Sequence, residues 1–309
     1  MDNLTHSLIG AALGQAGLKR KTGLAMPALI VGANLPDIDA GCVVYGIESL
    51  AMRRGLTHGP IALVVLPLLL AGALWWFDRW QERRGSRPPG RLPVRFGWLF
   101  ALSFLACLTH PLFDWFNNYG IRLLEPFSSQ WFYGDTLFII DPWIIAMLGM
   151  GIWLSLRREQ GGHGRWTRPA RTALVGLGAY AALNFATSGG AQTVASGDAP
   201  YAEVNVTNPP PLAFWTREVL WRTGDGRFGA IHCTFLRCRR YPLGLATTNM
   251  TDPRIAEWAA NDPAARAFLF WSRMPVAELH SDRIVLRDQR FMDPRFADRF
   301  TVTLSPTQP

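Results

Sequence analysis

The feature that most limits how this chain can fold is a series of long apolar segments that carry almost no charge. Four of them approach the roughly 20 residues that an α-helix needs to cross a bilayer, namely 59–77, 96–113, 136–156 and 172–191. Two shorter apolar stretches, residues 7–18 and 24–36, fit half-helices or helices that are buried against the others. We therefore predict a mainly α-helical, polytopic membrane bundle of about six apolar segments.

The remainder of the chain has the composition of an ordinary water-exposed domain. The whole-chain averages of 49% apolar and 17% charged residues, with a mean hydropathy of +0.08, therefore combine two unlike parts. We predict a membrane-embedded helical domain over residues 1–191 and a small α+β domain over residues 192–309. Residues 192–211 end in three prolines and fit a linker or a first strand.

Turn and capping signals predict the elements of this second domain. The alternating runs 213–221 and 229–236 are separated by a stretch that contains Thr-Gly-Asp-Gly, which indicates a β-hairpin. Thr251-Asp-Pro and Asn261-Asp-Pro each predict a helix with proline just inside its cap. Two later stretches return to strand-like composition, 282–291 and 299–304.

The loops between the apolar segments differ in positive charge. Residues 78–95 hold six arginines, residues 157–171 hold five, and residues 19–21 read Lys-Arg-Lys. The connections 37–58 and 117–135 together hold only three arginines. The positive-inside rule therefore places the first group in the cytoplasm. We expect a multi-pass protein of the bacterial inner membrane, with its C-terminal domain on the non-cytoplasmic side.

Charge and cysteine usage bear on partners and compartment. The net charge of +8 comes largely from basic residues between apolar segments rather than along one face of a folded domain. This distribution argues against nucleic-acid binding. Cys233 and Cys238 stand five residues apart, and they could form a disulfide if their domain faces an oxidising compartment.

Aspartates and histidines gather at the ends of the apolar segments on the predicted non-cytoplasmic side. His110 and Asp114 are four residues apart and would share one face of a helix. In a soluble helix they could form a surface pair, but ionisable groups in a membrane segment mark function by default. Asp37 and Asp39 follow another apolar run, where they could instead cap the next element. Carboxylates beside histidines would be held together by a divalent metal such as zinc.

Further candidates lie near these positions. Arg54 suits an anionic oxygen such as a phosphate bound beside a metal, and His58 follows it at the start of the apolar segment 59–77. The alternative is a juxtamembrane basic anchor and an interfacial histidine. His6 is either a ligand or part of an N-terminal helix cap. Asp141 is a candidate catalytic group, although Asp141-Pro142 could simply open a helix.

Several short motifs occur in a fixed order. They are Thr5-His6, Leu35-Pro-Asp-Ile-Asp39, Arg54-Gly-Leu-Thr-His58, His110-x3-Asp114, Phe116-Asn-Asn-Tyr-Gly120, Pro126-Phe-Ser128 and Ile140-Asp141-Pro142. Together they resemble the YdjM-type family of membrane-bound metal-dependent hydrolases over about residues 1–156. That family usually has His-Arg-Gly-x-Thr-His, whereas Arg53 replaces the first histidine here. If that histidine is a ligand elsewhere, this chain has one ligand fewer or uses a different second site.

The resemblance implies a ligand set and a reaction. The family is distantly similar to zinc-dependent phospholipase C and P1-type nucleases, which hold one zinc with an ordered Asp…His…His-x3-Asp set. Carried over, this implies a divalent metal, expected to be Zn²⁺, held by Asp37 or Asp39 with His58, His110 and Asp114. We take Asp39 as the ligand, His6 as a further ligand, and Asp37, Arg54 and Asp141 as catalytic groups.

The function implied is hydrolysis of a phosphoester bond in a membrane lipid or lipid-linked substrate. Two alternatives remain open at the level of sequence. An ion- or proton-coupled transporter would place its polar groups near the bilayer midplane, often within repeated halves. A metal-stabilised membrane scaffold would use its outer domain to bind a partner.

Overall fold

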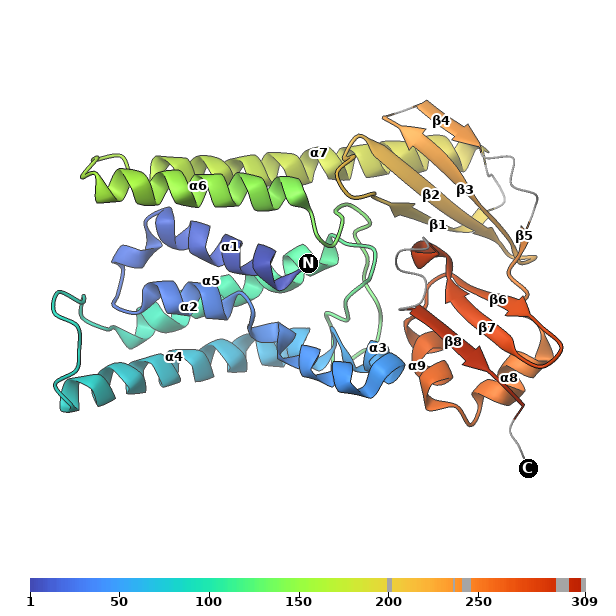
Figure 1. The fold of residues 1–309 in the computed structure, drawn as a ribbon, viewed down its shortest axis with the longest axis horizontal. Helices are drawn as coiled ribbons and strands as arrows, with labels where there is room; N and C mark the ends of the chain where they lie inside the picture. The colour runs from blue at the N-terminus through green and yellow to red at the C-terminus, as the bar shows by residue number, and fades with distance from the viewer. Residues whose placement is uncertain (199–201, 236, 241–245, 293–299, 307–309) are drawn as a thin grey trace. The chain divides into compact units, whose positions relative to one another are not determined.

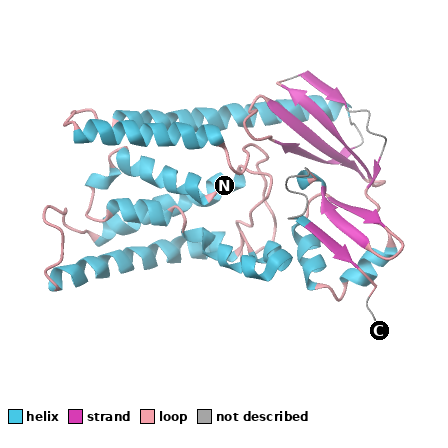
Figure 2. Ribbon diagram, in the orientation of Figure 1, coloured by secondary structure: helices cyan, strands magenta, loops and turns pink. Residues whose placement is uncertain are grey.

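The computed structural model describes residues 1–198, 202–235, 237–240, 246–292 and 300–306 (Figures 1 and 2). The chain is mainly helical with a C-terminal β-sheet region, as predicted. It divides into two compact units, which are described separately below. The first comprises residues 1–38 and 54–185, and the second comprises residues 39–53 and 186–309.

The first unit is a bundle of helices that run side by side (Figure 1). Its helices are α1 (Asn3–Gln15), α2 (Ala25–Gly32), α4 (Pro60–Arg83), α5 (Phe96–Trp115), α6 (Pro142–Gln160) and the first part of α7 (Arg168–Asp198). Two short 3₁₀ turns, η1 (Leu18–Arg20) and η3 (Leu56–His58), connect them. Helix α5 packs against α2 and α4, and α1 packs against α2 and α6.

Small residues let α1, α2 and α5 approach one another closely. A Cβ atom added at Gly10 of α1 would lie 2.4 Å from the carbonyl oxygen of Leu29 in α2. One added at Gly32 of α2 would lie 3.0 Å from the carbonyl oxygen of Ser103 in α5. Because small residues bring helix backbones together in membrane proteins, this packing brings the start of α1 and the end of α2 to the end of α5.

The number of membrane spans is smaller than the sequence predicted. Among the described residues, only α4 and α5 are long and apolar enough to cross a bilayer, and α2 with residues 35–52 makes a third candidate if this pair, bent by 42°, is one span. The expectation of about six spans is therefore wrong by this measure. Helices α1 and α2 have 13 and 8 residues, short of the roughly 20 that a span needs.

Charge and polarity keep the other two expected spans, in α6 and α7, from meeting the same measure. Helix α6 ends in Arg157-Arg158-Glu159, and the later part of α7 is rich in glycine, serine and threonine. Helix α4, in contrast, is apolar and exposed, because only 11% of its most apolar 18-residue stretch is buried. Its outward side chains, Ile61, Leu68 and Leu69 among them, form a surface suited to lipid.

Residues between α2 and α4 form 3₁₀ turns rather than a plain loop. Segment η2 (Leu35–Glu48) contains a break at Gly46, whose φ of 59° and ψ of −130° are not helical. The short helix α3 (Ser49–Met52) follows. Asp37 lies in the part of η2 that belongs to the first unit, whereas residues 39–53 belong to the second.

The second unit contains two antiparallel sheets. The first has the order β1-β2-β3-β4, with β5 also paired to β3, and the second has the order β6-β7-β8. The strands are β1 (Ala202–Asn208), β2 (Thr216–Thr223), β3 (Arg227–Thr234), β4 (Arg237–Arg240), β5 (Ala246–Thr247), β6 (Pro275–Leu279), β7 (Ile284–Asp288) and β8 (Thr301–Leu304). The predicted hairpin is confirmed as β2–β3, and a disulfide joins Cys233 of β3 to Cys238 of β4.

Both predicted helix starts of this unit are confirmed. Helix α8 (Pro253–Ala259) begins after Asp252 and α9 (Pro263–Trp271) begins after Asp262, and each aspartate accepts a hydrogen bond from a first-turn backbone N–H. The turn η4 (Gln289–Phe291) follows β7. Helix α7 extends to Asp198, into the stretch predicted as a linker or first strand. Residues 199–201 of that stretch, and residues 236 and 299 of two predicted strands, lie outside the described residues.

Candidate metal centre

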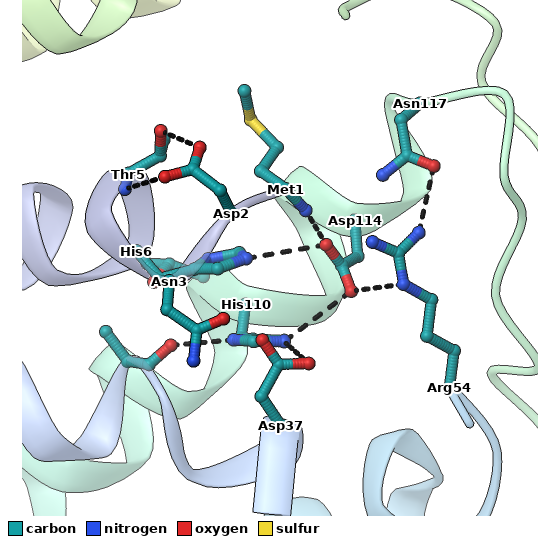
Figure 3. Close-up of polar contacts among 12 residues, drawn as sticks. Met1, Asp2, Asn3, Thr5, His6, Asp37, Arg54, His110, Asp114 and Asn117 are labelled. Carbon is teal, nitrogen blue, oxygen red and sulfur yellow. Dashed lines mark hydrogen bonds and ion pairs between the residues drawn. The ribbon is translucent and has the colours of Figure 1, made fainter. Parts of the chain in front are cut away.

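The last turns of α5 supply two side chains of the candidate centre. His110 and Asp114 are both fully buried, and the Nε2 atom of His110 lies 3.5 Å from Oδ2 of Asp114 (Figure 3). This is the helical face that the spacing of four residues predicts. Pro111 lies between them inside the helix.

The orientation of His110 is fixed by the end of α2. Its Nδ1 atom lies 2.7 Å from the carbonyl oxygen of Ala33, the residue that follows α2. A carbonyl oxygen only accepts hydrogen bonds, so Nδ1 carries the ring proton and the Nε2 lone pair points toward Asp114. Within the described part of the chain, this Nε2 atom has no hydrogen-bond partner.

Asp37 and His58 complete a group of four. Oδ1 of Asp37 lies 3.6 Å from Nε2 of His110, and Nε2 of His58 lies 3.6 Å from Oδ2 of Asp114. The other ring nitrogen of His58 is 3.0 Å from the hydroxyl of Thr57. Each of the four residues is buried and offers one ligand atom, and these atoms all lie within 4.8 Å of one another.

A close backbone contact holds His58 in place. Gly59 follows His58 and precedes α4, and a Cβ atom added there would lie 1.9 Å from the carbonyl oxygen of Glu125. Only glycine fits this contact, because any side chain would collide with backbone. Gly59 therefore lets the end of η3 pack directly against the backbone of Glu125.

Arg54 provides positive charge beside the group. Its Nε atom lies 3.1 Å from Oδ2 of Asp114, and its Nη1 donates to Oδ1 of Asn117 at 2.9 Å (Figure 3). Its guanidinium also lies over the ring of Tyr119, 4.6 Å from the centroid. The amino group of Met1 contacts the other oxygen of Asp114. Arg54 is thus buried, its guanidinium is oriented by Asn117 and Tyr119, and it forms an ion pair with Asp114.

His6 lies next to the group of four. It is fully buried, its Nε2 is 3.4 Å from Oδ1 of Asp114, and its ring stacks on His110 with 3.8 Å between centroids. Neither ring nitrogen has a hydrogen-bond partner among the described residues. Burial, followed by the positive charge of the Met1 amino group, lowers the pKa of His6 well below its usual value, so the ring is neutral.

His6 is not needed to cap α1. Asp2 takes that role, since its carboxylate accepts hydrogen bonds from the backbone N–H and the hydroxyl of Thr5 at 3.1 and 2.6 Å (Figure 3). The cap leaves the His6 ring directed at Asp114. The interpretation of His6 as part of an N-terminal cap therefore has no support in the geometry.

Two other predicted site residues are not members of the group of four. Asp141 caps α6, since its carboxylate accepts from the backbone N–H groups of Trp143 and Ile144 at 2.9 and 3.2 Å and from the hydroxyl of Tyr180 at 3.0 Å. Asp39 belongs to the second unit and is not a member of the group of four. The acid that joins His58, His110 and Asp114 is Asp37.

Sequence reasoning did not identify every residue that shapes the centre. Asn117 holds Arg54 and also accepts from the backbone N–H of Tyr119 at 2.9 Å. Its position inside the motif Phe116-Asn-Asn-Tyr-Gly120 was the available signal. The contact from Ala33 to His110 has no sequence signal, because a backbone carbonyl is present at every position.

Comparison with known proteins gives two matches. The family described as YdjM inner membrane protein matches residues 1–191. The uncharacterized protein YfhP of Bacillus subtilis (strain 168) is 28% identical in an alignment of 167 residues that covers 50% of this chain and 46% of that protein. The match thus spans about half the length of the relative. No solved structure matches, and the likeness to phospholipase C and P1-type nucleases is not shown by these comparisons.

Proposed function

This chain belongs to the YdjM inner membrane protein family, and we propose that it is a membrane-bound, metal-dependent hydrolase. Its centre would be the buried group of Asp37, His58, His110 and Asp114, which would hold one divalent cation. The observation that carries the proposal is the convergence of four ligand atoms from buried residues within 4.8 Å of one another.

The spacing of the ligand atoms supports a cation between them. Zinc binds imidazole and carboxylate at about 2.0–2.2 Å with tetrahedral geometry, so two of its ligand atoms stand about 3.3–3.6 Å apart. Three of the six separations among the ligand atoms are 3.5, 3.6 and 3.6 Å, and all six are within 4.8 Å. These separations exceed the roughly 2.7–3.2 Å of a good hydrogen bond. A shared cation accounts for them better than direct bonding does.

The protonation of His110 gives independent support. With its proton on Nδ1, the lone pair of Nε2 faces carboxylate oxygens, which are also acceptors. Acceptors that face each other in a buried site are unfavourable unless a cation or a proton lies between them. Metal-bound histidines usually donate their second ring N–H to a carboxylate, carbonyl or water, and the Ala33 carbonyl accepts that hydrogen bond from His110.

The chain's own groups suit hydrolysis of an anionic ester. When bound, a cation of this kind polarises a substrate oxygen and lowers the pKa of a neighbouring water. Neutral His6, with Nε2 3.4 Å from Asp114, is positioned to accept a proton. Arg54 orients Asp114 and adds positive charge that favours a phosphoester over a neutral substrate. Membership of an inner membrane family favours a lipid or lipid-linked phosphoester.

The position of the group favours a hydrolase over a transporter. His110 and Asp114 lie in the last six residues of the 20-residue helix α5, at the end of a candidate membrane span. Transport sites lie near the middle of the bilayer, typically on broken helices. Asp39 and Asp141 have no part in the proposed chemistry, because Asp39 is not in the group and Asp141 caps a helix.

Metal content tests the proposal directly. Protein purified in detergent is analysed by inductively coupled plasma mass spectrometry as wild type, His58→Ala and Asp114→Ala. His163→Ala serves as a control, because this exposed histidine lies outside the group. We expect about one zinc per chain in the wild type and the control, and loss of the metal in the two site variants. Full occupancy in both folded site variants would discard the site.

Activity then tests the reaction. The same preparations are incubated with detergent-solubilised phospholipids, and release of phosphorylated head groups is measured before and after removal of metal by a chelator. We expect activity that disappears with the metal, returns with added Zn²⁺ and is absent from His58→Ala. A protein that binds metal tightly but hydrolyses none of these lipids would favour a metal-stabilised scaffold.

A further inference from the structure

We propose that the first unit carries a second ligand site, for the head group of an anionic phospholipid, at the end of the bundle opposite the metal centre. An open surface cavity of about 370 Å³ lies there between η1, the turn after it, the start of α2 and the loop before α5. Among its lining residues are Lys19, Arg20, Leu24, Met26 and Leu92. Its volume lies in the range of about 300–1,000 Å³ that small-ligand pockets occupy.

The cavity is separate from the metal centre. Helix α5 begins at Phe96, four residues after the cavity-lining Leu92, and reaches His110 near its other end. At 1.5 Å per residue, the stretch from Phe96 to His110 is about 21 Å long. Helix α2 likewise begins at the cavity with Ala25 and ends beside His110. A ligand in the cavity is therefore out of reach of the proposed hydrolytic group.

The cavity lies where head groups of a bilayer would lie. It is at the start of α5 and of the bent pair that begins with α2, and both are candidate membrane spans. Trp166 lies at the same end, with the Lys19 and Arg20 cations 4.7 and 4.9 Å from its ring centroid. Trp98 lies 5.0 Å from the ammonium of Lys21. Tryptophan next to basic residues is typical of the membrane–water interface.

The charge of the lining selects for an anion. Lys19 and Arg20 are the basic residues of its lining, and among the described residues that line it there is no aspartate or glutamate. Lys19 is also engaged by Glu159 and Gln15, so it supplies a partly neutralised charge. Arg20 is exposed, and its guanidinium lies over Trp166. Arg20 is therefore the main cation offered to a ligand.

The apolar part of the lining selects a lipid over a free anion. Leu24, Met26 and Leu92 offer apolar surface beside the two cations. An inorganic phosphate would use only the cations, whereas a phospholipid would use both surfaces. Basic pockets between membrane helices commonly hold anionic head groups in this way. In the orientation predicted from the loop charges, this site faces the cytoplasmic leaflet.

Lipid binding by the purified full chain tests the proposal. The protein in detergent is titrated with phosphatidylglycerol, phosphatidylcholine or inorganic phosphate, and bound molecules are counted by native mass spectrometry. The variants are Arg20→Glu, Arg20→Lys, which keeps the charge, and Arg158→Glu as a control. Arg158 is exposed at the same end of the unit, next to Glu159, and does not line the cavity.

We expect wild type, Arg20→Lys and Arg158→Glu to bind phosphatidylglycerol in preference to phosphatidylcholine. Arg20→Glu should bind phosphatidylglycerol at least about fivefold more weakly, because it removes one cationic contact. Metal content should stay the same in all four proteins, which separates this site from the proposed hydrolytic centre.

Equal phosphatidylglycerol binding by Arg20→Glu and wild type would overturn the proposal, as would equal binding of the two lipids by wild type. Binding of inorganic phosphate as tightly as phosphatidylglycerol would replace the lipid with a free anion. If Arg20→Glu fails to fold, Arg20→Gln takes its place, because it removes the positive charge without adding a negative one. Phosphatidylglycerol binding by folded Arg20→Gln that equals binding by wild type would then count against the site.

Discussion

Asp114 shows how much of the candidate centre depends on single side chains. One of its oxygens lies 3.5 and 3.6 Å from ring nitrogens of His110 and His58, and the other lies 3.4 Å from His6. Arg54 lies 3.1 Å from the first of these oxygens and is itself held by Asn117. The orientation of the Asp114 carboxylate therefore depends on the Arg54 guanidinium, which contacts Asp114 through one nitrogen and Asn117 through another.

Replacing that guanidinium tests its positioning role. We expect Arg54→Lys to lower metal affinity about 10–100-fold, the usual effect of losing an outer partner of a ligand. A lysine ammonium is a point charge, and it cannot bond Asp114 and Asn117 in two directions as the planar fork does. Competition with a fluorescent zinc chelator measures the affinity, with Arg158→Lys as the control. Unchanged affinity combined with a raised KM would instead make Arg54 a substrate-binding residue.

Sequence alone could not decide between Asp37 and Asp39. Both lie in a segment that the structure shows as 3₁₀ turns, with about three residues per turn. Residues two apart on such a turn point about 120° away from each other, so only one of them can face a given centre. Neither the sequence pattern nor the resemblance of motifs indicated this 3₁₀ geometry. For His110 and Asp114 the spacing alone predicted that the two side chains meet, because residues four apart share one face of a regular α-helix.

At the scale of elements, the start of helix α6 gives Asp141 a structural role as a helix cap. Asp141 satisfies two first-turn N–H groups of α6 and the hydroxyl of Tyr180. We expect Asp141→Ala to lower the free energy of unfolding by about 0.5–2 kcal/mol, the usual cost of losing a cap. Zinc content should be unchanged. Denaturant titration in detergent measures the first effect, and elemental analysis the second.

Asp141→Asn is the matched variant, because asparagine caps helices about as well as aspartate does. It should keep both stability and any hydrolytic activity. A fully stable Asp141→Asn protein that binds zinc but has lost activity would restore Asp141 as a catalytic residue.

The elements that were predicted well are those with local signals. Proline after a capping aspartate located α8 and α9, and the Thr-Gly-Asp-Gly stretch located the β2–β3 hairpin. The number of spans was overestimated because apolar composition does not distinguish a lipid-facing helix from one packed inside a bundle. Helices α1 and α2 are short and carry Ile9 and Leu29 into the interior, where they are almost fully buried. Such burial follows from tertiary packing rather than from local sequence.

At the scale of the whole molecule, the disulfide bears on the orientation in the membrane. Cys233 and Cys238 are joined, whereas Cys42 and Cys107 are free. Disulfides persist in oxidising compartments and are rare in the cytoplasm. The pairing therefore offers a way to test the prediction from loop charges that the C-terminal domain lies outside the cytoplasm.

Thiol labelling of whole cells tests this orientation. Cells are quenched with acid, denatured and treated with a maleimide that adds a large mass to each thiol. We expect two labelled cysteines without reductant and four after reduction, with Cys233→Ser/Cys238→Ser showing two in both cases. Four labelled cysteines without reductant would place the domain in a reducing compartment and reverse the proposed topology.

The central claim is that Asp37, His58, His110 and Asp114 hold one metal ion. X-ray absorption at the zinc edge of the purified protein measures the ligands around that ion. We predict nitrogen and oxygen neighbours at about 2.0–2.2 Å, with the outer-shell scattering of two imidazoles. A spectrum with sulfur neighbours, or one without imidazole scattering, would contradict the account.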